Sequence, residues 1–520
     1  MDTFLQRLGS NVKGVIEGFD RIVFKGMLKP LLYPGGFSFF LNRQGVLNKD
    51  YKTFVTAATD TIEADAKRLV LSSGVGDITY LPSLHTRKEE LAHQRQIELG
   101  IKDGLIGIWS CVEGCKTFRS VFDREQGYPQ LSLHNSRCKH LYSYLDHEDF
   151  GFMSIRLQTW APYEIQIALN GREWLKHQLE KAGLGFVVDG NKFLDIADFN
   201  AAQAFLDEQV RSRWIEMLDG FAHLAFPSFA SVLGDQMSYT WTLWQSEWAR
   251  DYVFCDQRTL DDLMPMYLRH AFIAGNAERV LRYMGSPVRN DGLPRTNASL
   301  QLQTAFDQWY DGGRIKHRVN KNSVKMYNEH NVLRCELTMN DPTRFKVHRT
   351  TEGKDDGEKK LLPMRKGIAD ITVRTQISSA RLNNFTEQMA TITESSSVRE
   401  LLTALAAPVK NDKRRYRGLE VMGKDRMLLE AVADPKFTVD AITNKALREM
   451  LENTSWANGL SGKQLSARIS RALRLLREHG LIKKEAKQNK YYLTQKGRLA
   501  TSALLQCLGA RVCDLAKLAA

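Results

Sequence analysis

The sequence has no apolar run of the length that a membrane-spanning helix requires, which is about 20 residues. Its first residues, Met-Asp-Thr-Phe-Leu-Gln-Arg, lack the charged start and the apolar middle of a secretory signal peptide. Cysteine is scarce: seven residues are scattered over 520, an odd number that argues for reduced thiols rather than a disulfide framework. We therefore expect a cytoplasmic protein with no membrane partner.

Several catalytic motifs are also missing. The sequence contains no GxxxxGK[ST], which disfavours a P-loop nucleotide hydrolase. It has no His-hydrophobic-His pair of the kind that holds the metal of rolling-circle initiators, and no Ser-His-Asp or Cys-His arrangement can be argued from it. The cysteines and histidines match no compact zinc motif closely, so no zinc site is predicted.

Positive charge, in contrast, is abundant. The chain has 73 Lys and Arg residues against 60 Asp and Glu, which gives a formal net charge of +13. This excess suits a polyanionic partner, DNA or RNA. Because the charge is spread along the chain, it does not by itself distinguish DNA from RNA.

The most readable stretch is residues 461–498. Apolar residues recur there at helical spacing on one face, and arginines spaced by three lie off that face. Ser461-Gly462 opens the helix, Gly480 ends it, and a short hairpin with a lysine-rich tip follows. This order predicts a winged helix, with the arginines in a major groove and the lysines on phosphates. The predicted contacts are Arg468, Arg471, Arg474, Arg477, Lys483, Lys484, Lys487 and Lys490.

Short strands with polar, Pro or Gly joints alternate with helices in the rest of the chain. We predict an α+β fold of mainly antiparallel sheets with flanking helices, plus the C-terminal winged-helix domain. The length exceeds what one core supports. The predicted domains are an N-terminal α+β domain at 1–235, a second α+β domain with a basic hairpin at 236–409, and a nucleic-acid-binding domain at 418–520.

The basic hairpin runs from Lys316 to Glu336. Charges at alternate positions share one face of a strand, and an aromatic residue lies near the turn. Such a face suits a nucleic-acid backbone with base stacking, the alternative being a solvated sheet face. The predicted contacts are Lys316, Arg318, Lys321, Lys325, Tyr327, Arg334 and Lys346.

Carboxylates in predicted strands hint at metal-dependent phosphodiester chemistry. Asp20 ends one apolar strand, Glu113 ends another and Glu336 lies in a third. Two-metal nucleases need carboxylates that converge from different strands, and an RNase-H-like arrangement would place Asp20 and Glu113 on adjacent strands. This interpretation implies Mg²⁺ as the cofactor. In the alternative, Asp20 pairs with Arg21 or caps a turn.

Two more carboxylates lie at the end of a Trp-rich stretch, residues 236–255. Glu247 and Asp251 are four residues apart, so a helix would place them on one face. We expect them to bind a basic neighbour rather than a metal.

Two resemblances accompany these patterns. Residues 14–26 (Gly-Val-Ile-Glu-Gly-Phe-Asp-Arg-Ile-Val-Phe-Lys-Gly), 150–163, 170–175, 245–251, 325–337 and 476–484 resemble a broad group of bacterial proteins with a C-terminal winged helix. Some of that group are labelled transcriptional regulators, and the resemblance implies no particular activity. Residues 325–337 also resemble the Tyr-Asp-Lys…Leu-Arg-Ile-Glu segment of filamentous-phage and plasmid replication initiators, with Asn328-Glu329 in place of Asp-Lys.

These features predict a nucleic-acid-binding protein of a mobile-element, replication or defence system. Three alternatives stay open. The first is an RNA-binding component of a ribonucleoprotein, including one that its RNA guides to DNA. The second is a metal-dependent nuclease or recombinase using Asp20, Glu113 and Glu336. The third is a transcription regulator whose large body senses a ligand.

Overall fold

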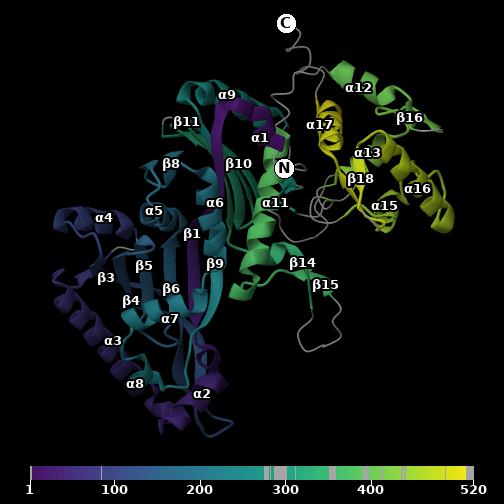
Figure 1. The fold of residues 1–520 in the computed structure, drawn as a ribbon. Coiled ribbons are helices and arrows are strands. Elements are labelled where there is room, and N and C mark those ends of the chain that lie inside the picture. The colour runs from purple at the N-terminus through teal and green to yellow at the C-terminus, as the bar shows by residue number, and fades with distance from the viewer. Residues whose placement is uncertain are drawn as a thin grey trace.

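A computed structural model (Figure 1) describes residues 3–82, 85–274, 280–281, 283–285, 301–310, 312–350, 359–389, 398–411, 414–434, 437, 441–485 and 488–510. Its main feature is an eleven-stranded sheet of order β10-β11-β12-β13-β9-β1-β6-β5-β4-β3-β2. Neighbouring strands run antiparallel, except β2 and β3, which are parallel. The predicted α+β class with a mainly antiparallel sheet and flanking helices is therefore confirmed.

The strands of this sheet are β1 (Val12–Met27), β2 (Thr79–Tyr80), β3 (Gly104–Asp123), β4 (Tyr128–His147), β5 (Gly151–Gln158), β6 (Ile165–Asn170), β9 (Thr240–Phe254), β10 (Leu302–Trp309), β11 (Gly312–Val319), β12 (Asn322–Glu329) and β13 (Val332–Met339). The helices around it are α1 (Thr3–Leu8), α2 (Pro34–Arg43), α3 (Tyr51–Ser73), α4 (Lys88–Leu99), α5 (Gly171–Lys181), α6 (Phe199–Val210), α7 (Trp214–Ala225), α8 (Phe229–Leu233), α9 (Gln257–Ala274) and α11 (Ile371–Met389). Two small hairpins join β7 (Phe186–Asp189) to β8 (Lys192–Ile196) and β14 (Lys346–Thr350) to β15 (Lys359–Pro363).

Strand β9 connects the two halves of the sheet. It pairs with β1 on one side and with β13 on the other. The strands after residue 236 therefore extend the sheet of residues 1–235 rather than forming a second one, and one hydrophobic core runs from Phe4 to Met389. The predicted helix around Glu247 and Asp251 is wrong, because both residues lie in β9. Its aromatic and β-branched residues fit a half-buried strand better than a helix.

The two faces of the central strands differ. Helix α11 covers one face, where its Arg374 donates to Ser246 Oγ at 2.9 Å and its Asn383 accepts from Arg250 at 2.7 Å. Because successive side chains of a strand alternate, Glu247 points to the opposite face. We call that opposite face the polar face.

The end of the polar face near residues 12–18 of β1 is covered. The β7–β8 hairpin contacts it through Asn191, whose backbone oxygen accepts from Arg334. Helix α6 packs against β1 there, and a Cβ added to Gly18 would lie 2.8 Å from the Leu206 side chain. The carboxylates described below lie just beyond this cover.

The C-terminal elements have a hydrophobic core of their own, from Leu405 to Leu504. Figure 1 shows them gathered to one side of the large sheet. They are α12 (Val398–Ala406), β16 (Val409–Asn411), β17 (Arg414–Tyr416), α13 (Arg426–Val432), α15 (Asn444–Leu451), α16 (Gly462–Glu478), β18 (Ile482–Lys484), β19 (Tyr491–Leu493) and α17 (Gln495–Gly509). The predicted helix and hairpin correspond to α16 and β18–β19, while their assignment as a winged helix stays a prediction.

Among the described residues, no helix combines the length and the apolar character that crossing a membrane requires.

Candidate metal centre

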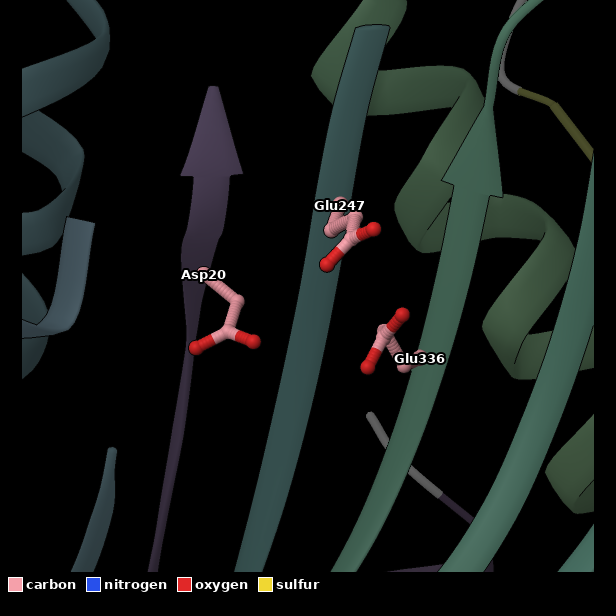
Figure 2. Close-up of side chains that lie close together, drawn as sticks. All are labelled: Asp20, Glu247 and Glu336. Carbon is pink, nitrogen blue, oxygen red and sulfur yellow. The ribbon is translucent and has the colours of Figure 1, made fainter. Parts of the chain in front are cut away.

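Three carboxylates from adjacent strands meet on the polar face. Asp20 on β1, Glu247 on β9 and Glu336 on β13 each place a carboxylate oxygen within 4.8 Å of the other two. Figure 2 shows the three side chains on neighbouring strands, directed toward one another. Asp20 and Glu336 are 8 % and 2 % exposed, and Glu247 is partly buried. Of the described residues, these form the one group of three or more acidic, His or Cys side chains close enough to share an ion.

Asp20 owes its position to an irregularity in β1. The register of β1 on β9 shifts between Phe19, which pairs with Trp248, and Arg21, which pairs with Glu247. Asp20 is the extra residue of this bulge. A bulge re-aims a side chain that regular alternation would direct elsewhere, and bulges are frequent beside active sites.

Each carboxylate is held by a neighbour. Lys325 Nζ lies 2.6 Å from Glu336 Oε1, which also accepts from the Thr338 hydroxyl at 3.1 Å. The Asp20 carboxylate accepts from Arg334 and from Asn191, both at 3.1 Å. Glu247 accepts from the Gln245 amide at 3.0 Å. The hydrogen bonds orient all three groups before any ligand binds.

A buried ion network lies next to the centre. Arg334 donates to Asp251 at 2.8 Å as well as to Asp20, and Arg172 lies 3.0 Å from Asp251. Centre and network together hold four carboxylates and three cations. They are Asp20, Glu247, Asp251 and Glu336, and Arg172, Lys325 and Arg334. With every group ionised, one negative charge is left unbalanced.

The unbalanced negative charge is reflected in the raised pKa of Glu247. Burial and, after it, the charge of Glu336 raise its pKa from an ordinary 4.5 to about 7, against the opposing charge of Lys325. Burial acts to lower the pKa of Lys325, but Glu336 and Glu247 outweigh it, so the pKa is raised and the ammonium stays charged. The centre is therefore a desolvated, electron-rich site with two cations beside it, Lys325 at Glu336 and Arg334 at Asp20.

The donor set suits a hard divalent cation. Carboxylate oxygens are the ligands that Mg²⁺ and Mn²⁺ prefer. Any three ligands of an octahedral Mg²⁺ include at least two neighbouring pairs, whose oxygens lie about 3 Å apart, so the three carboxylates would have to rotate closer together to hold one ion. One dication would change the local charge from −1 to +1, whereas two would leave +3. The charge balance therefore favours a single ion.

Glu113, the third predicted carboxylate, lies elsewhere. It is on β3, and β6, β5 and β4 separate β3 from β1, so the predicted adjacency of Asp20 and Glu113 is wrong. Two cations contact the Glu113 carboxylate: Arg156 lies 2.7 Å from it and Lys88 lies 3.7 Å from it. Burial acts to raise its pKa, but hydrogen bonds from Cys111, Tyr142 and Arg156 lower it to about 2. It is a paired structural carboxylate.

Glu247 takes the place predicted for Glu113. Glu247 is not among the predicted ligands of this centre, because its four-residue spacing to Asp251 predicts a helix instead of a strand. The available signal was the run Thr-Leu-Trp-Gln-Ser-Glu-Trp-Ala-Arg-Asp-Tyr-Val-Phe, in which an acidic residue interrupts an aromatic, strand-like pattern.

The predicted basic hairpin, Lys316 to Glu336, spans three strands, β11, β12 and β13; its predicted first arm is wrong, because a turn that contains Lys321 separates β11 from β12. Lys316 faces Lys325 across β11 and β12 on the polar face and is partly exposed. Arg318, Lys321 and Lys346 are exposed. Tyr327 and Arg334 are 5 % and 1 % exposed, so their predicted contact with nucleic acid does not fit; they belong to the support of the centre.

The predicted C-terminal contacts are mostly on the surface. Arg471, Arg474 and Arg477 on α16 are exposed, and so are Lys483, Lys484 and Lys490. Arg468 packs over the Trp456 ring at 4.6 Å. Arg477 pairs with Glu478 at 2.6 Å. Lys487 lies outside the described residues.

Comparison of the chain with family models, with curated proteins and with solved structures gives no match.

Proposed function

We propose that this chain binds nucleic acid and breaks or exchanges phosphodiester bonds, using a divalent cation held by Asp20, Glu247 and Glu336. The observation that carries the proposal is the convergence of three carboxylates from adjacent strands within 4.8 Å, beside Lys325. A cation there would polarise a phosphoryl oxygen and lower the pKa of a bound water. Such chemistry fits the mobile-element, replication or defence setting that the sequence predicts.

The residues around the centre would supply the rest. Lys325 places a buried positive charge next to Glu336, where it can offset the charge that develops on a phosphoryl group in the transition state. Lys316 and Arg318 continue the positive charge along β11, where a nucleic-acid backbone can follow it. Arg334 acts as a positioning residue, because it holds Asp20 without being accessible itself.

Cleavage of labelled nucleic acid with and without Mg²⁺ or Mn²⁺ tests this function. Glu247→Gln should lower the metal-dependent rate at least about 100-fold, since several kcal/mol of transition-state stabilisation depend on the ion. Glu113→Gln is the matched control: it removes a partly buried carboxylate that lies outside the centre. If Glu247→Gln cleaves like the wild type, or if cleavage needs no metal, the assignment is wrong.

A second candidate is a sequence-specific DNA-binding regulator. The observation that favours it is α16, a helix with its apolar side in the C-terminal core and Arg471 and Arg474 on its exposed side. A regulator should prefer one duplex sequence, and Glu247→Gln should leave that preference unchanged. Arg471→Ala with Arg474→Ala should abolish it.

A further inference from the structure

A second irregularity in the β1–β9 pair exposes a tryptophan beside the centre. The register shifts again between Val23, which pairs with Gln245, and Phe24, which pairs with Leu243. Trp244 is the extra residue, and it is 40 % exposed at a point where β9 has passed the end of β13, whose pairing with β9 stops at Ser246. Leaving an indole in water forgoes the free energy of burying it. A bulge that keeps it there needs an explanation beyond packing.

Two lysines contact this indole. Lys366 Nζ lies 3.9 Å from the ring centroid and Lys25 Nζ 5.0 Å from it. Lys25 also pairs with Glu164 at 2.6 Å. Both are cation–π contacts. Such contacts are weak at exposed sites, so either ammonium can move from the ring to a phosphate with a small loss of free energy.

More positive charge surrounds the pair. The pKa of Lys366 is lowered first by burial and then by the charges of Arg374, Lys321 and Lys25, against the opposing charge of Asp341. Lys321 is exposed in the turn between β11 and β12. An aromatic platform within a cluster of cations matches the chemistry of a base with its phosphates.

The platform lies close to the centre. Trp244 precedes Glu247 by three residues on β9, which corresponds to a rise of roughly 10 Å along the strand. Lys25 is four residues from Arg21 on β1, so the two side chains lie on the same face of the strand, and Arg21 pairs directly with Glu247. The platform, meaning the Trp244 indole with its two lysines, therefore lies on the same face as the centre. One extended strand can contact both.

We propose that Trp244, with Lys25 and Lys366, binds an unpaired base of single-stranded nucleic acid next to the Asp20–Glu247–Glu336 centre. This inference rests on the proposed function and adds its substrate class. A base that stacks on the indole displaces one ammonium onto the phosphate attached to that base. A duplex cannot use the platform in this way, since its bases are already stacked on one another.

Binding of labelled oligothymidylate, oligouridylate and an equally long duplex, all with chelator present so that no metal-dependent cleavage occurs, tests the proposal. Trp244→Ala should weaken binding of the single strands by about 10-fold or more, and Trp244→Phe by less than about 3-fold, because stacking on an aromatic ring is retained. Neither should alter duplex binding. Phe122→Ala is the matched control, because it removes another exposed aromatic ring, on β3, away from the centre.

The inference is wrong if Trp244→Ala binds single strands like the wild type, or weakens single strands and duplex equally. Trp244→Phe keeps the test valid if the alanine variant loses stability, because it keeps an aromatic ring at this position. The two proposals fail separately. Loss of cleavage in Glu247→Gln with unchanged binding in Trp244→Ala would overturn the platform alone. Weaker binding in Trp244→Ala with no metal-dependent cleavage in the wild type would overturn the metal centre alone.

Discussion

Glu247 combines two properties that conflict in the metal-free protein, burial and a negative charge beside Glu336. Its pKa of about 7 means that folding favours the protonated form. The unfolded chain releases this proton near pH 4.5 and the folded chain near pH 7, so the folded state loses stability as the pH rises between these values. A group kept at such a cost is more readily explained by binding than by folding.

We therefore expect Glu247→Gln to stabilise the metal-free protein at high pH. The shift corresponds to roughly 3 kcal/mol, at 1.4 kcal/mol for each pKa unit, because an amide has no charge to desolvate. The free energy of unfolding with chelator present should exceed that of the wild type at about pH 8, and this gain should shrink toward about pH 5. A variant that is less stable than the wild type at high pH would show that Glu247 supports the fold.

At the scale of the elements, the sequence predicts two of the three carboxylates on the central strands, Asp20 and Glu336, but not the third, Glu247. Asp20 and Glu336 were found because each stands in a strongly apolar segment, and buried charge in such a segment needs a partner. The third member was missed because strand order and bulges decide which residues meet. A shift of one residue in register reverses the direction of a side chain, and no local pattern records it.

The packing of the start of α5 against β1 can be tested by substitution of Gly171. Gly171 begins this helix directly after β6, and a Cβ there would lie 2.2 Å from the backbone oxygen of Phe19, the neighbour of Asp20. Gly171→Ala must push β1 away, so we expect a loss of about 1–3 kcal/mol in the free energy of unfolding and weaker metal-dependent cleavage.

Gly220→Ala is its control. Gly220 lies inside α7 with no atom within 4 Å of the added Cβ, so alanine should be neutral or stabilising there by up to about 1 kcal/mol. Equal stability of Gly171→Ala and the wild type would contradict the tight packing of α5 on β1.

At the scale of the whole molecule, the net charge of +13 is distributed over two bodies of structure. The large sheet carries the carboxylate centre and its lysines, and the C-terminal core presents α16. The predicted α+β class followed from composition and periodicity. The joining of residues 12–339 into one sheet did not, because pairing between distant strands depends on contacts that no short stretch encodes.

Salt dependence separates the contributions of these bodies. Replacing both Arg471 and Arg474 by Ala should reduce the slope of log affinity against log salt for duplex DNA by about 2, one unit for each lost phosphate contact. The pair Arg119→Ala and Arg124→Ala, on the exposed β3–β4 hairpin, makes the same change in net charge. If both pairs alter the slope equally, only overall charge matters and α16 has no special role.

The measurement closest to the central claim is calorimetric titration of the protein with Mn²⁺. We expect about one bound ion per chain, at least about tenfold weaker binding in Glu247→Gln, and unchanged binding in Glu113→Gln. Binding that is the same in the wild type and in Glu247→Gln would contradict the assignment of Asp20, Glu247 and Glu336 as a metal centre.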